Sequence, residues 1–321
     1  MGGFSLPFLP VSGLANYVAV FGGSDTLLFN GAGQTLSLSV TLETEGQTHE
    51  FVLVPAAGQG LCLASGHEDT AAPDGTRPSG HAPRHLAGEK EFCDRKSPLH
   101  RAIASWMPCH FHETGAGAAL RRSAHVFDVA SLRPDGSNLA PVLLHLRTQA
   151  PRRFLRLVEM VRRMAPFFED FCFLTPFEDQ VSLAWKQRHS DYLLRAYQLS
   201  DGTLRFLALA TALLQPEPPS LMLMDEPELG LHPQALALLA DLIKQAASRS
   251  QIVLATQSAA LLDFFSLEDV VIVTRQRGAS VFFRPSADED AARLQDCSLG
   301  ELWRKNVLAA GPVAEQAISP S

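Results

Sequence analysis

The sequence predicts an α/β fold, and three observations support that prediction. Predicted strands and helices alternate after residue 199, as in sheets whose parallel strands are joined by crossover helices. The four apolar residues Leu221–Met224 predict a buried strand, and Asp225 and Glu226 follow it at once. Residues 17–55 contain short β-type runs separated by turn residues. We therefore expect a mixed sheet flanked by helices, with an N-terminal antiparallel β part and a helical insertion.

The N-terminal part is expected to be rich in β-structure. Leu36, Leu38, Val40 and Leu42 alternate with polar residues, so one face of that strand should be buried and the other exposed to water. The segment Glu43–Gln47 is typical of a hairpin turn. The expected strands are Tyr17–Phe21, Thr26–Phe29, Thr35–Leu42 and Glu50–Val54.

The middle of the chain changes character twice. Residues 64–97 are polar and rich in Gly and Pro, which indicates a surface insertion. Downstream, the turn Asp135–Asn138 should cap a helix that ends near Leu146. The other expected elements here are a short helical stretch around Leu99–Trp106, a helix over Pro151–Met164 and a strand over Val181–Trp185.

The C-terminal part carries the strand and helix alternation. Ser200 or Asp201 can cap an apolar helix that runs to Leu214, and prolines stop that helix. A long helix should follow Pro233 and continue to about Ser248. The remaining expected elements are a buried strand Gln251–Ala255, a hairpin formed by Val270–Thr274 and Val281–Phe283, and a last helix Leu299–Val307.

Composition narrows the class of protein. The chain has 321 residues, of which 46% are hydrophobic, so it can bury a large core. Its formal net charge of −7 disfavours a general nucleic-acid coat, although local basic patches remain possible. The five scattered cysteines contain no CxxC pair, which favours free thiols in a reducing compartment. Without an 18-residue apolar run or a basic signal-peptide region, a cytoplasmic protein without membrane contact is expected.

Two other motifs allow more than one interpretation. The two histidines His110 and His112, next to Glu113, resemble part of a zinc site. No third ligand to join the two histidines is evident, so structural polar contacts are the favoured interpretation. The expected helix Pro151–Met164 has Phe154, Leu155, Val158, Val161 and Met164 at helical spacing on one face. Its other face carries Arg152, Arg153, Arg156, Arg162 and Arg163. That face could contact nucleic acid or an acidic partner, but a solvated face is the favoured interpretation.

The adjacent acids Asp225 and Glu226 are the strongest functional signal. They stand at the carboxyl end of a buried strand, where open α/β sheets bind their ligands. Two carboxylates at that position cost free energy unless a cation or a reaction uses them. The stretch therefore predicts a site for phosphate and magnesium, with a helix-capping acid at a plain strand end as the alternative.

Three segments in a fixed order now carry a family resemblance. The turn Leu199–Arg205 resembles the signature loop of ATP-binding-cassette ATPases, and Leu221–Glu226 resembles their Walker B strand. Leu229–Pro233 is similar to the D-loop, and Ala255–Ser258 stands where the family has its sensor loop. More narrowly, the chain resembles the stand-alone AAA-type P-loop ATPases related to SMC, DNA-repair and OLD proteins. The resemblance implies ATP and Mg²⁺ as cofactors, a homodimer, and a role linked to DNA repair or phage defence, with nucleic acid or an effector protein as partner.

The resemblance also implies a role for each site residue. Asp225 would hold the magnesium ion and Glu226 would activate the attacking water. Ser200, Asp201, Gly202 and Thr203, at a helix N-terminus, would bind a phosphate of nucleotide held by the partner subunit. His232 would lie near the dimer interface. Gln257 would lie near the γ-phosphate, where the family often has His. Gln can still donate a hydrogen bond but cannot carry charge, so its role is open, with a purely structural role as the alternative.

The phosphate-binding loop of this family is missing from the sequence. None of the five lysines follows a glycine in the pattern Gly-x-x-x-x-Gly-Lys-Ser/Thr. Asn30–Thr35 looks like a damaged copy with Gln34 at the lysine position, but it precedes a strand pattern where the loop should open a helix. We expect the sequence to begin downstream of the loop, either as a truncated or mis-started version of a longer protein or as a degenerate member.

Two functional hypotheses follow. The first is an ATPase that dimerises with nucleotide, and the second is a non-hydrolysing scaffold or binding module of the same fold. A nuclease of the OLD type would need a further acidic domain after the ATPase, for which the chain ends too early. The expected organisation is a β-rich ATPase part (1–63), an insertion (64–98), a helical and β lobe (99–190), the ATPase core (191–311) and a tail (312–321).

Overall fold

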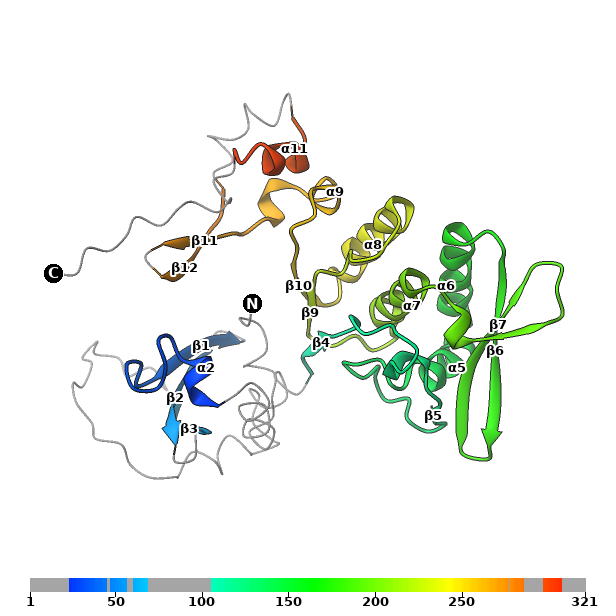
Figure 1. Cartoon of the computed structure of the whole chain (residues 1–321), viewed down its shortest axis with the longest axis horizontal. Coiled ribbons are helices and arrows are strands. Elements are labelled where there is room, and N and C mark those ends of the chain that lie inside the picture. The colour runs from blue at the N-terminus through cyan, green and yellow to red at the C-terminus, as the bar shows by residue number, and fades with distance from the viewer. Residues whose placement is uncertain are drawn as a thin grey trace. The chain divides into compact units, whose positions relative to one another are not determined.

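The structure is a computed structural model that describes residues 23–44, 47–56, 60–68, 105–276, 278–285 and 297–307. The chain divides into two compact units (Figure 1). One contains residues 1–108 with 219–221, and the other contains residues 109–218 with 222–321. Small sheets and flanking helices alternate along the described ranges, as the α/β prediction requires.

In its described residues, the first unit holds one short helix and an antiparallel sheet. Helix α2 is Ser24–Leu27, and the sheet has the order β1-β2-β3, with β1 Leu38–Thr44, β2 Gln47–Ala56 and β3 Gly60–Glu68. Thr44 pairs with Gln47, so the predicted hairpin between β1 and β2 is confirmed.

Several boundaries in the first unit differ from the sequence prediction. The predicted strand at Thr26–Phe29 is wrong, because α2 occupies Thr26 and Leu27 and a turn follows. The predicted strand from Thr35 begins only at Leu38, and Leu36 is 73% exposed. Strand β3 continues to Glu68, beyond the expected start of the insertion. The expected strand Tyr17–Phe21 and most of the expected insertion and of the helix Leu99–Trp106 lie outside the described residues.

Residues 29–37 form turns, and the strand β1 follows them. The amide of Ala32 donates to Oδ1 of Asp25 at 2.8 Å, and the Thr35 hydroxyl donates to the carbonyl of Phe29. A phosphate-binding loop opens a helix, so this segment does not have the backbone that such a loop needs.

The remaining elements belong to the second unit, except that Met107 and Pro108 of β4 and Leu221 of β9 are assigned to the first. The helices of the second unit are α5 Leu139–Gln149, α6 Pro151–Met164, α7 Asp201–Leu214, α8 Pro233–Ala246, α9 Ala259–Leu262 and α11 Leu299–Arg304. Its strands are β4 Met107–Cys109, β5 Ala124–His125, β6 Phe168–Phe177, β7 Gln180–Gln187, β8 Leu193–Arg195, β9 Leu221–Asp225, β10 Gln251–Ala255, β11 Ile272–Gln276 and β12 Ala279–Phe283. Single 3-10 turns are η2 Ala119–Arg121, η3 Ala196–Gln198 and η4 Leu267–Asp269.

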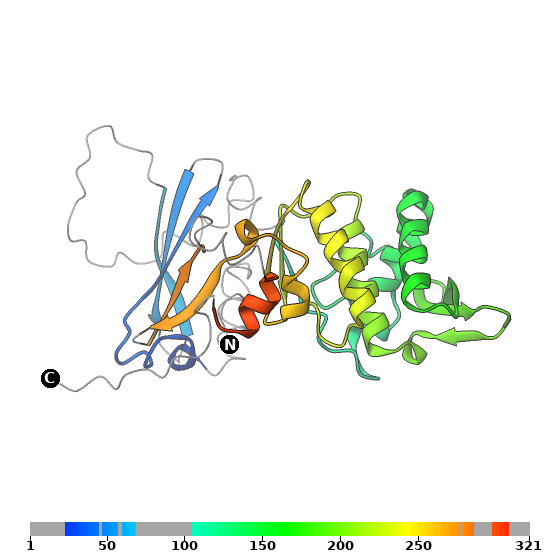
Figure 2. The same cartoon turned by 90° about the horizontal axis from the view of Figure 1, so that it is seen from above.

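Helix α7 is the centre of the hydrophobic core in the second unit. Its residues from Phe206 to Leu214 are all buried, because nearly every position is Ala, Leu or Phe. It packs against α5, α6 and α8 (Figures 1 and 2). Burial of a single Leu or Phe side chain contributes about 1.5–3 kcal/mol, so this helix is held in place mainly by its apolar surface.

Strand β9 lies between β10 and β4 in one sheet. Helix α8 connects β9 to its neighbour β10, which is the kind of connection that parallel strands need. The expected strand Gln251–Ala255 has the predicted bounds, but its residues are half-buried or exposed and not buried as predicted. This β9–α8–β10 unit brings the carboxyl end of β9 next to the residues that follow β10.

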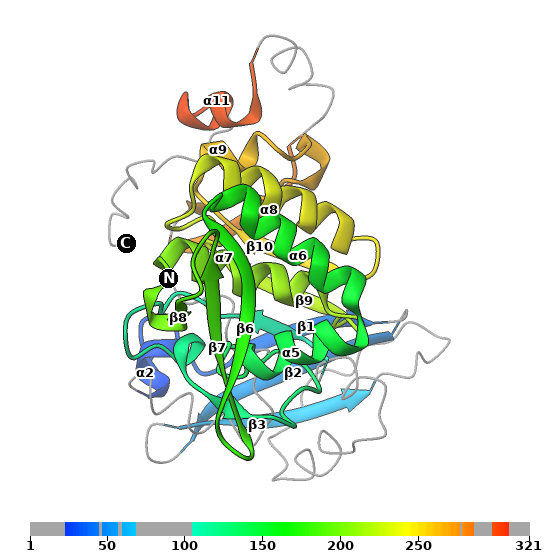
Figure 3. The same cartoon turned by 90° about the vertical axis from the view of Figure 1, so that its right-hand side faces the viewer.

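The sequence prediction missed two long strands, β3 in the first unit and β6 in the second. Strand β6 pairs with β7 in an antiparallel hairpin that packs along α5 and α6 (Figure 3). Phe168 and Phe171 are buried, whereas Glu169 and Asp170 between them are exposed. The pairing register shifts between Phe168 and Asp170, and this irregularity breaks the alternation that would have identified the strand.

Helix α6 has the predicted bounds, but its arginine face is not simply solvated. Arg153 donates from Nη1 to the carbonyls of Leu214 at 3.1 Å and Gln215 at 2.5 Å, and so satisfies the end of α7. Arg162 pairs with Glu159 at 2.5 Å, and Arg156 bonds Gln245 of α8. The buried positions are Phe154, Leu157, Val158, Met160 and Val161, whereas Leu155, predicted on the buried face, is 60% exposed.

The C-terminal elements form a separate small cluster. Leu267, Ile272, Leu299 and Leu302 are buried together. The predicted hairpin is confirmed, with β11 starting at Ile272. A membrane-crossing helix would need a longer apolar run than any helix provides within the described ranges.

Candidate functional site

Asp225 and Glu226 lie where β9 leaves the core. Met222 and Met224 are buried, and Asp225, the last residue of the strand, is exposed. Glu226 has a φ of 42°, and its amide donates to the carbonyl of Ala255 at 2.8 Å. A left-handed conformation at a non-glycine residue costs about 1–3 kcal/mol and occurs often at functional sites. The chain therefore turns sharply at Glu226 while the contact with β10 is kept.

The acids around this turn repel one another. The pKa of Glu226 is raised above its ordinary value of 4.5, first by burial and then by the charges of Glu228 and Asp225, while His112 opposes the shift. A carboxyl group with a raised pKa is a stronger base than an ordinary glutamate. The position of Glu226 therefore suits proton transfer or the orientation of a water molecule.

Asp225 is free to bind a cation. Within the described ranges it has no hydrogen-bond or ion-pair partner in the protein. Carboxylate oxygens are the ligands that Mg²⁺ prefers, and the ion usually takes only one or two of them from the protein. Asp225 and Glu226 border a small pocket, whose other lining residues are Cys109, Phe111, His112, Arg205, Leu209, Met224 and Pro227.

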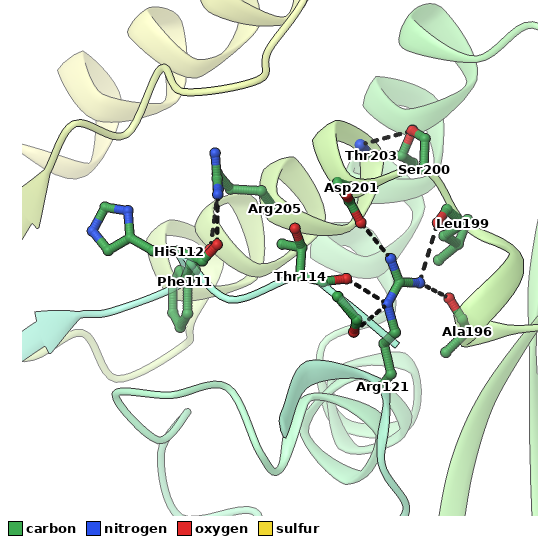
Figure 4. A network of polar contacts seen from close by, with 11 residues as sticks. Phe111, His112, Thr114, Arg121, Ala196, Leu199, Ser200, Asp201, Thr203 and Arg205 are labelled. Atoms are coloured by element: carbon green, nitrogen blue, oxygen red, sulfur yellow. Dashed lines mark hydrogen bonds and ion pairs between the residues drawn. The ribbon is translucent and has the colours of Figure 1, made fainter. Parts of the chain in front are cut away.

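Arg205 and the loop after β4 form a part of this pocket that sequence analysis did not identify. Arg205 of α7 donates to the carbonyls of Phe111 at 3.0 Å and His112 at 2.7 Å (Figure 4). It also donates to the carbonyl of Leu229. One guanidinium thus holds the loop after β4 and the turn after β9 together. Burial lowers the pKa of Arg205, and Asp201 opposes that effect.

The His110–Glu113 segment is irregular and does not continue β4. The pKa of His110 is lowered by burial and by His112, while Asp225 raises it. His110 and His112 therefore lie close enough to the acids at the end of β9 for electrostatic interaction, His110 with Asp225 and His112 with Glu226. No cluster of three His, Cys, Asp or Glu side chains suited to a metal occurs among the residues that the structure describes. The HxHE pattern was the available signal for this proximity, but its partner acids are more than 100 residues away in sequence.

The predicted signature turn caps α7. The Ser200 Oγ atom accepts the Thr203 amide at 3.2 Å and contacts the Thr203 hydroxyl at 2.7 Å (Figure 4). Asp201 does not point to an open site, because its Oδ1 forms an ion pair of 2.7 Å with Nη2 of Arg121. Sequence analysis missed Arg121, which is distant in the chain.

Arg121 connects the signature turn to two other segments. Its side chain is only 6% exposed, and Nε donates to the carbonyls of Thr114 at 2.7 Å and Gly115 at 3.2 Å. Nη1 donates to the carbonyls of Ala196 and, at 3.1 Å, Leu199. The cation therefore fixes the entrance to α7 from the side of the loop after β4.

Gly202 and Gly230 bring the signature turn against the turn after β9. A Cβ atom on Gly202 would overlap the carbonyl oxygen of Gly230. Gly230 has a φ of 72°, which favours glycine over other residues. The two turns can approach this closely only because Gly202 has no side chain to meet the carbonyl oxygen of Gly230.

We expect Gly202→Ala to lower the free energy of unfolding by about 1–3 kcal/mol, because the added methyl group must push backbone against backbone. Urea unfolding followed by circular dichroism measures the change. Gly117→Ala is the matched control, since a Cβ at Gly117 meets no atom within 4 Å. Equal stability of the two variants would show that the approach of Gly202 to Gly230 is not tight.

The remaining predicted residues occupy two further turns. His232 is exposed and caps α8, with its Nδ1 atom accepting the Gln234 amide at 3.3 Å. Gln257 is exposed in the turn after β10 and has no partner in the described part of the chain. Its neighbours are held: Thr256 Oγ1 accepts the Ser258 amide at 2.9 Å, and Ser258 caps α9.

The structure thus brings some predicted residues together and leaves others apart. The turn with Asp225 and Glu226 contacts the Gln257 turn through the Ala255 carbonyl. Gly202 meets the turn that leads to His232. The polar groups of Ser200, Asp201 and Thr203 are engaged locally, and no hydrogen bond or ion pair in the described structure joins them to Asp225 or Glu226.

Comparison with known proteins gives a family for this segment. Residues 104–263, about half of the chain, match the family described as "AAA domain, putative AbiEii toxin, Type IV TA system". The match contains the β4 loop, α7, the turn after β9 and the turn after β10. No curated protein sequence matches the chain.

One solved structure of an SMC head domain is similar in fold, and two further SMC structures match at lower scores. An SMC head bound to the C-winged helix domain of ScpA is 14% identical, with a TM-score of 0.51, and the match covers 88% of this chain and 85% of that one. The SMC head domain from Thermotoga maritima is 12% identical, with a TM-score of 0.41 and coverages of 85% and 84%. A chain from a study of ATP-driven dimerization and DNA stimulated activation of SMC ATPases is 20% identical, with a TM-score of 0.36 and coverages of 48% and 94%.

Proposed function

Since the chain belongs, through residues 104–263, to the AAA-type P-loop ATPases with the ABC and SMC-like fold, we propose that Asp225 and Glu226 serve the hydrolysis of ATP. The observation that carries the proposal is the turn after β9. It presents two acids side by side: the exposed Asp225 carboxylate, which has no partner among the described residues, and the Glu226 carboxyl, whose pKa is raised.

The two acids are assigned different tasks because their surroundings differ. Asp225 would hold Mg²⁺, since its oxygens are unpartnered within the described ranges and open to solvent. Glu226 would orient the attacking water and accept its proton, since burial and two neighbouring acids raise its pKa. ATP would supply the reacting γ-phosphoryl group, and Mg²⁺ would neutralise the charge that develops on its oxygens.

We propose that the phosphate-binding half of the site includes a second copy of the chain. The exposed N-terminus of α7 offers Ser200, Gly202 and Thr203 with the positive end of the helix dipole. No bond in the described structure joins this turn to Asp225 or Glu226, and the turn would therefore bind nucleotide that a partner subunit holds and not nucleotide at its own two acids. His232 and Gln257 are both exposed and would face that nucleotide or the partner.

A non-hydrolysing module of the same fold is the second candidate, and one observation favours it. The 321 residues contain no Gly-x-x-x-x-Gly-Lys-Ser/Thr loop to grip the phosphates. The segment Asn30–Thr35 forms turns that lead into a strand. A protein with this sequence could keep the dimer surface and the carboxylates without turnover.

Steady-state ATP turnover separates the two candidates. Turnover is measured for the 321-residue chain and for a version of it that is extended at the N-terminus by a segment with a Gly-Lys-Ser/Thr loop. Activity of either protein supports the ATPase, and Asp225→Asn should lower its Mg²⁺-dependent rate at least about 100-fold. Asp241→Asn, an exposed acid on α8, is the matched control. Inactivity of both parent proteins would favour the scaffold, and an Asp225→Asn protein with the parent's rate would remove the metal assignment.

A further inference from the structure

Glu228 occupies an unusual place in the turn after β9. It follows Glu226 by two residues, and its Oε1 atom accepts the hydroxyl of Thr256, which follows β10. Its Oε2 atom is buried and has no hydrogen-bond partner among the described residues. A buried oxygen without a donor costs about 1–3 kcal/mol, so this position bears a carboxylate at some cost to stability.

The Thr256 hydroxyl has two roles at once. Oγ1 donates to Glu228 and accepts the amide of Ser258 at 2.9 Å. The Ser258 hydroxyl in turn accepts the Leu261 amide at 3.2 Å and caps α9. A continuous line of hydrogen bonds therefore runs from the turn after β9, through the turn after β10, into the next helix.

This line runs beside a backbone contact. The amide of Glu226 donates to the carbonyl of Ala255 at 2.8 Å, one residue before Thr256. The two turns are thus joined twice, by a backbone bond at Glu226 and by a side-chain bond at Glu228. Gln257 lies between Thr256 and Ser258. Gln257 is exposed, whereas both of its neighbours take part in the hydrogen bond between them.

We propose that Glu228 is a positioning residue that fixes the Thr256–Ser258 turn to the end of β9, so that Glu226 and Gln257 keep a constant separation. A carboxylate suits this task because a charge-assisted bond to a hydroxyl is roughly twice as strong as a neutral one. The consequence for turnover rests on the proposed ATPase function, whereas the coupling between the two turns does not.

The coupling is tested by amide hydrogen exchange of the full chain, followed by mass spectrometry on peptides that cover residues 252–262. We expect Glu228→Ala to speed exchange there about tenfold, the effect of losing one hydrogen bond of about 1.4 kcal/mol. Thr256→Val also loses the bond from the Ser258 amide, so it should speed exchange at least as much. The double variant should exchange no faster than Thr256→Val alone. Thr256→Ser keeps the hydroxyl and should behave as the parent, as should Glu217→Ala, an exposed acid in the loop before β9.

Parent-like exchange in Glu228→Ala would overturn the proposal, as would additive effects in the double variant. A second readout applies to a protein that hydrolyses ATP. There Glu228→Ala should lower kcat about tenfold with KM unchanged, and Glu228→Gln, which keeps an oxygen acceptor, should restore most of it. If Glu228→Ala changes amide exchange but leaves kcat unchanged, Glu228 stabilises the turn without positioning Glu226 and Gln257 for turnover. If the parent has no turnover, the proposed ATPase fails, while the exchange measurements still decide the coupling.

Discussion

Glu226→Gln is expected to lower kcat for ATP hydrolysis at least about 100-fold, because glutamine cannot accept a proton from the attacking water. The protein to be measured is the version that carries a phosphate-binding loop. ATP binding should persist, since the substitution leaves Asp225 and the helix N-terminus at Ser200 in place. With hydrolysis blocked, ATP should shift the variant towards the dimer, which size-exclusion chromatography with light scattering detects.

The stability of the variant provides a control against misfolding. The raised pKa of Glu226 means that the folded chain holds this proton more tightly than the unfolded chain does. Ionisation of Glu226 therefore removes stability as the pH rises from about 4.5 through the raised pKa. Glutamine lacks this cost, so at pH 7 the variant should unfold at or above the parent's temperature. Its advantage should vanish at pH 4.

Glu217→Gln, an exposed acid outside the pocket, is the matched control for turnover. Turnover by Glu226→Gln at the parent's rate would remove Glu226 from the mechanism. Loss of both turnover and ATP binding, with stability retained, would instead indicate that Glu226 contributes to nucleotide affinity.

Arg121→Ala is expected to lower the free energy of unfolding by about 3 kcal/mol, the largest effect on stability that we predict. The guanidinium is 6% exposed and donates to the carbonyls of Thr114, Gly115, Ala196 and Leu199. Removal of the donor leaves carbonyl oxygens without a partner at the entrance to α7. Its ion pair with the exposed Asp201 adds little, because exposed pairs are weak.

Arg122→Ala provides the comparison, because Arg122 is exposed and bonds only the carbonyl of Gly117 in the described structure. Urea unfolding should separate the two variants by about 2 kcal/mol or more. Similar midpoints and slopes for both would show that the Arg121 network is not a main support of the signature turn.

Local signals explain why parts of the fold could be predicted. Helix α6 was placed correctly because Pro151 starts it and apolar residues recur at helical spacing. Strand β10 and the cap of α7 at Ser200 were also predicted, since a short apolar run and a capping residue act locally. The strand expected at Thr26–Phe29 failed because four short-range positions cannot distinguish a helical turn from a strand.

The candidate site shows the same division. Sequence alone identified Asp225 and Glu226, because an apolar strand that ends in two acids is a local pattern. It did not identify Arg121, Arg205 or Glu228, each of which bonds at least one residue between 24 and 94 positions away in the sequence. Nothing in the pattern near an arginine indicates which distant carbonyl oxygens it will bind.

The sequence by itself determined the α/β class, the acids at the end of β9 and the turns that carry Ser200 and Gln257. These follow from hydrophobic periodicity, capping and chain order, which act over a few residues. Only the tertiary structure decided that Asp201 is bound by Arg121, that Gly202 meets Gly230, and that Glu228 joins Thr256. Those contacts depend on how α7, β9 and β10 pack, because the burial of their apolar surfaces brings polar groups from distant segments within hydrogen-bonding distance.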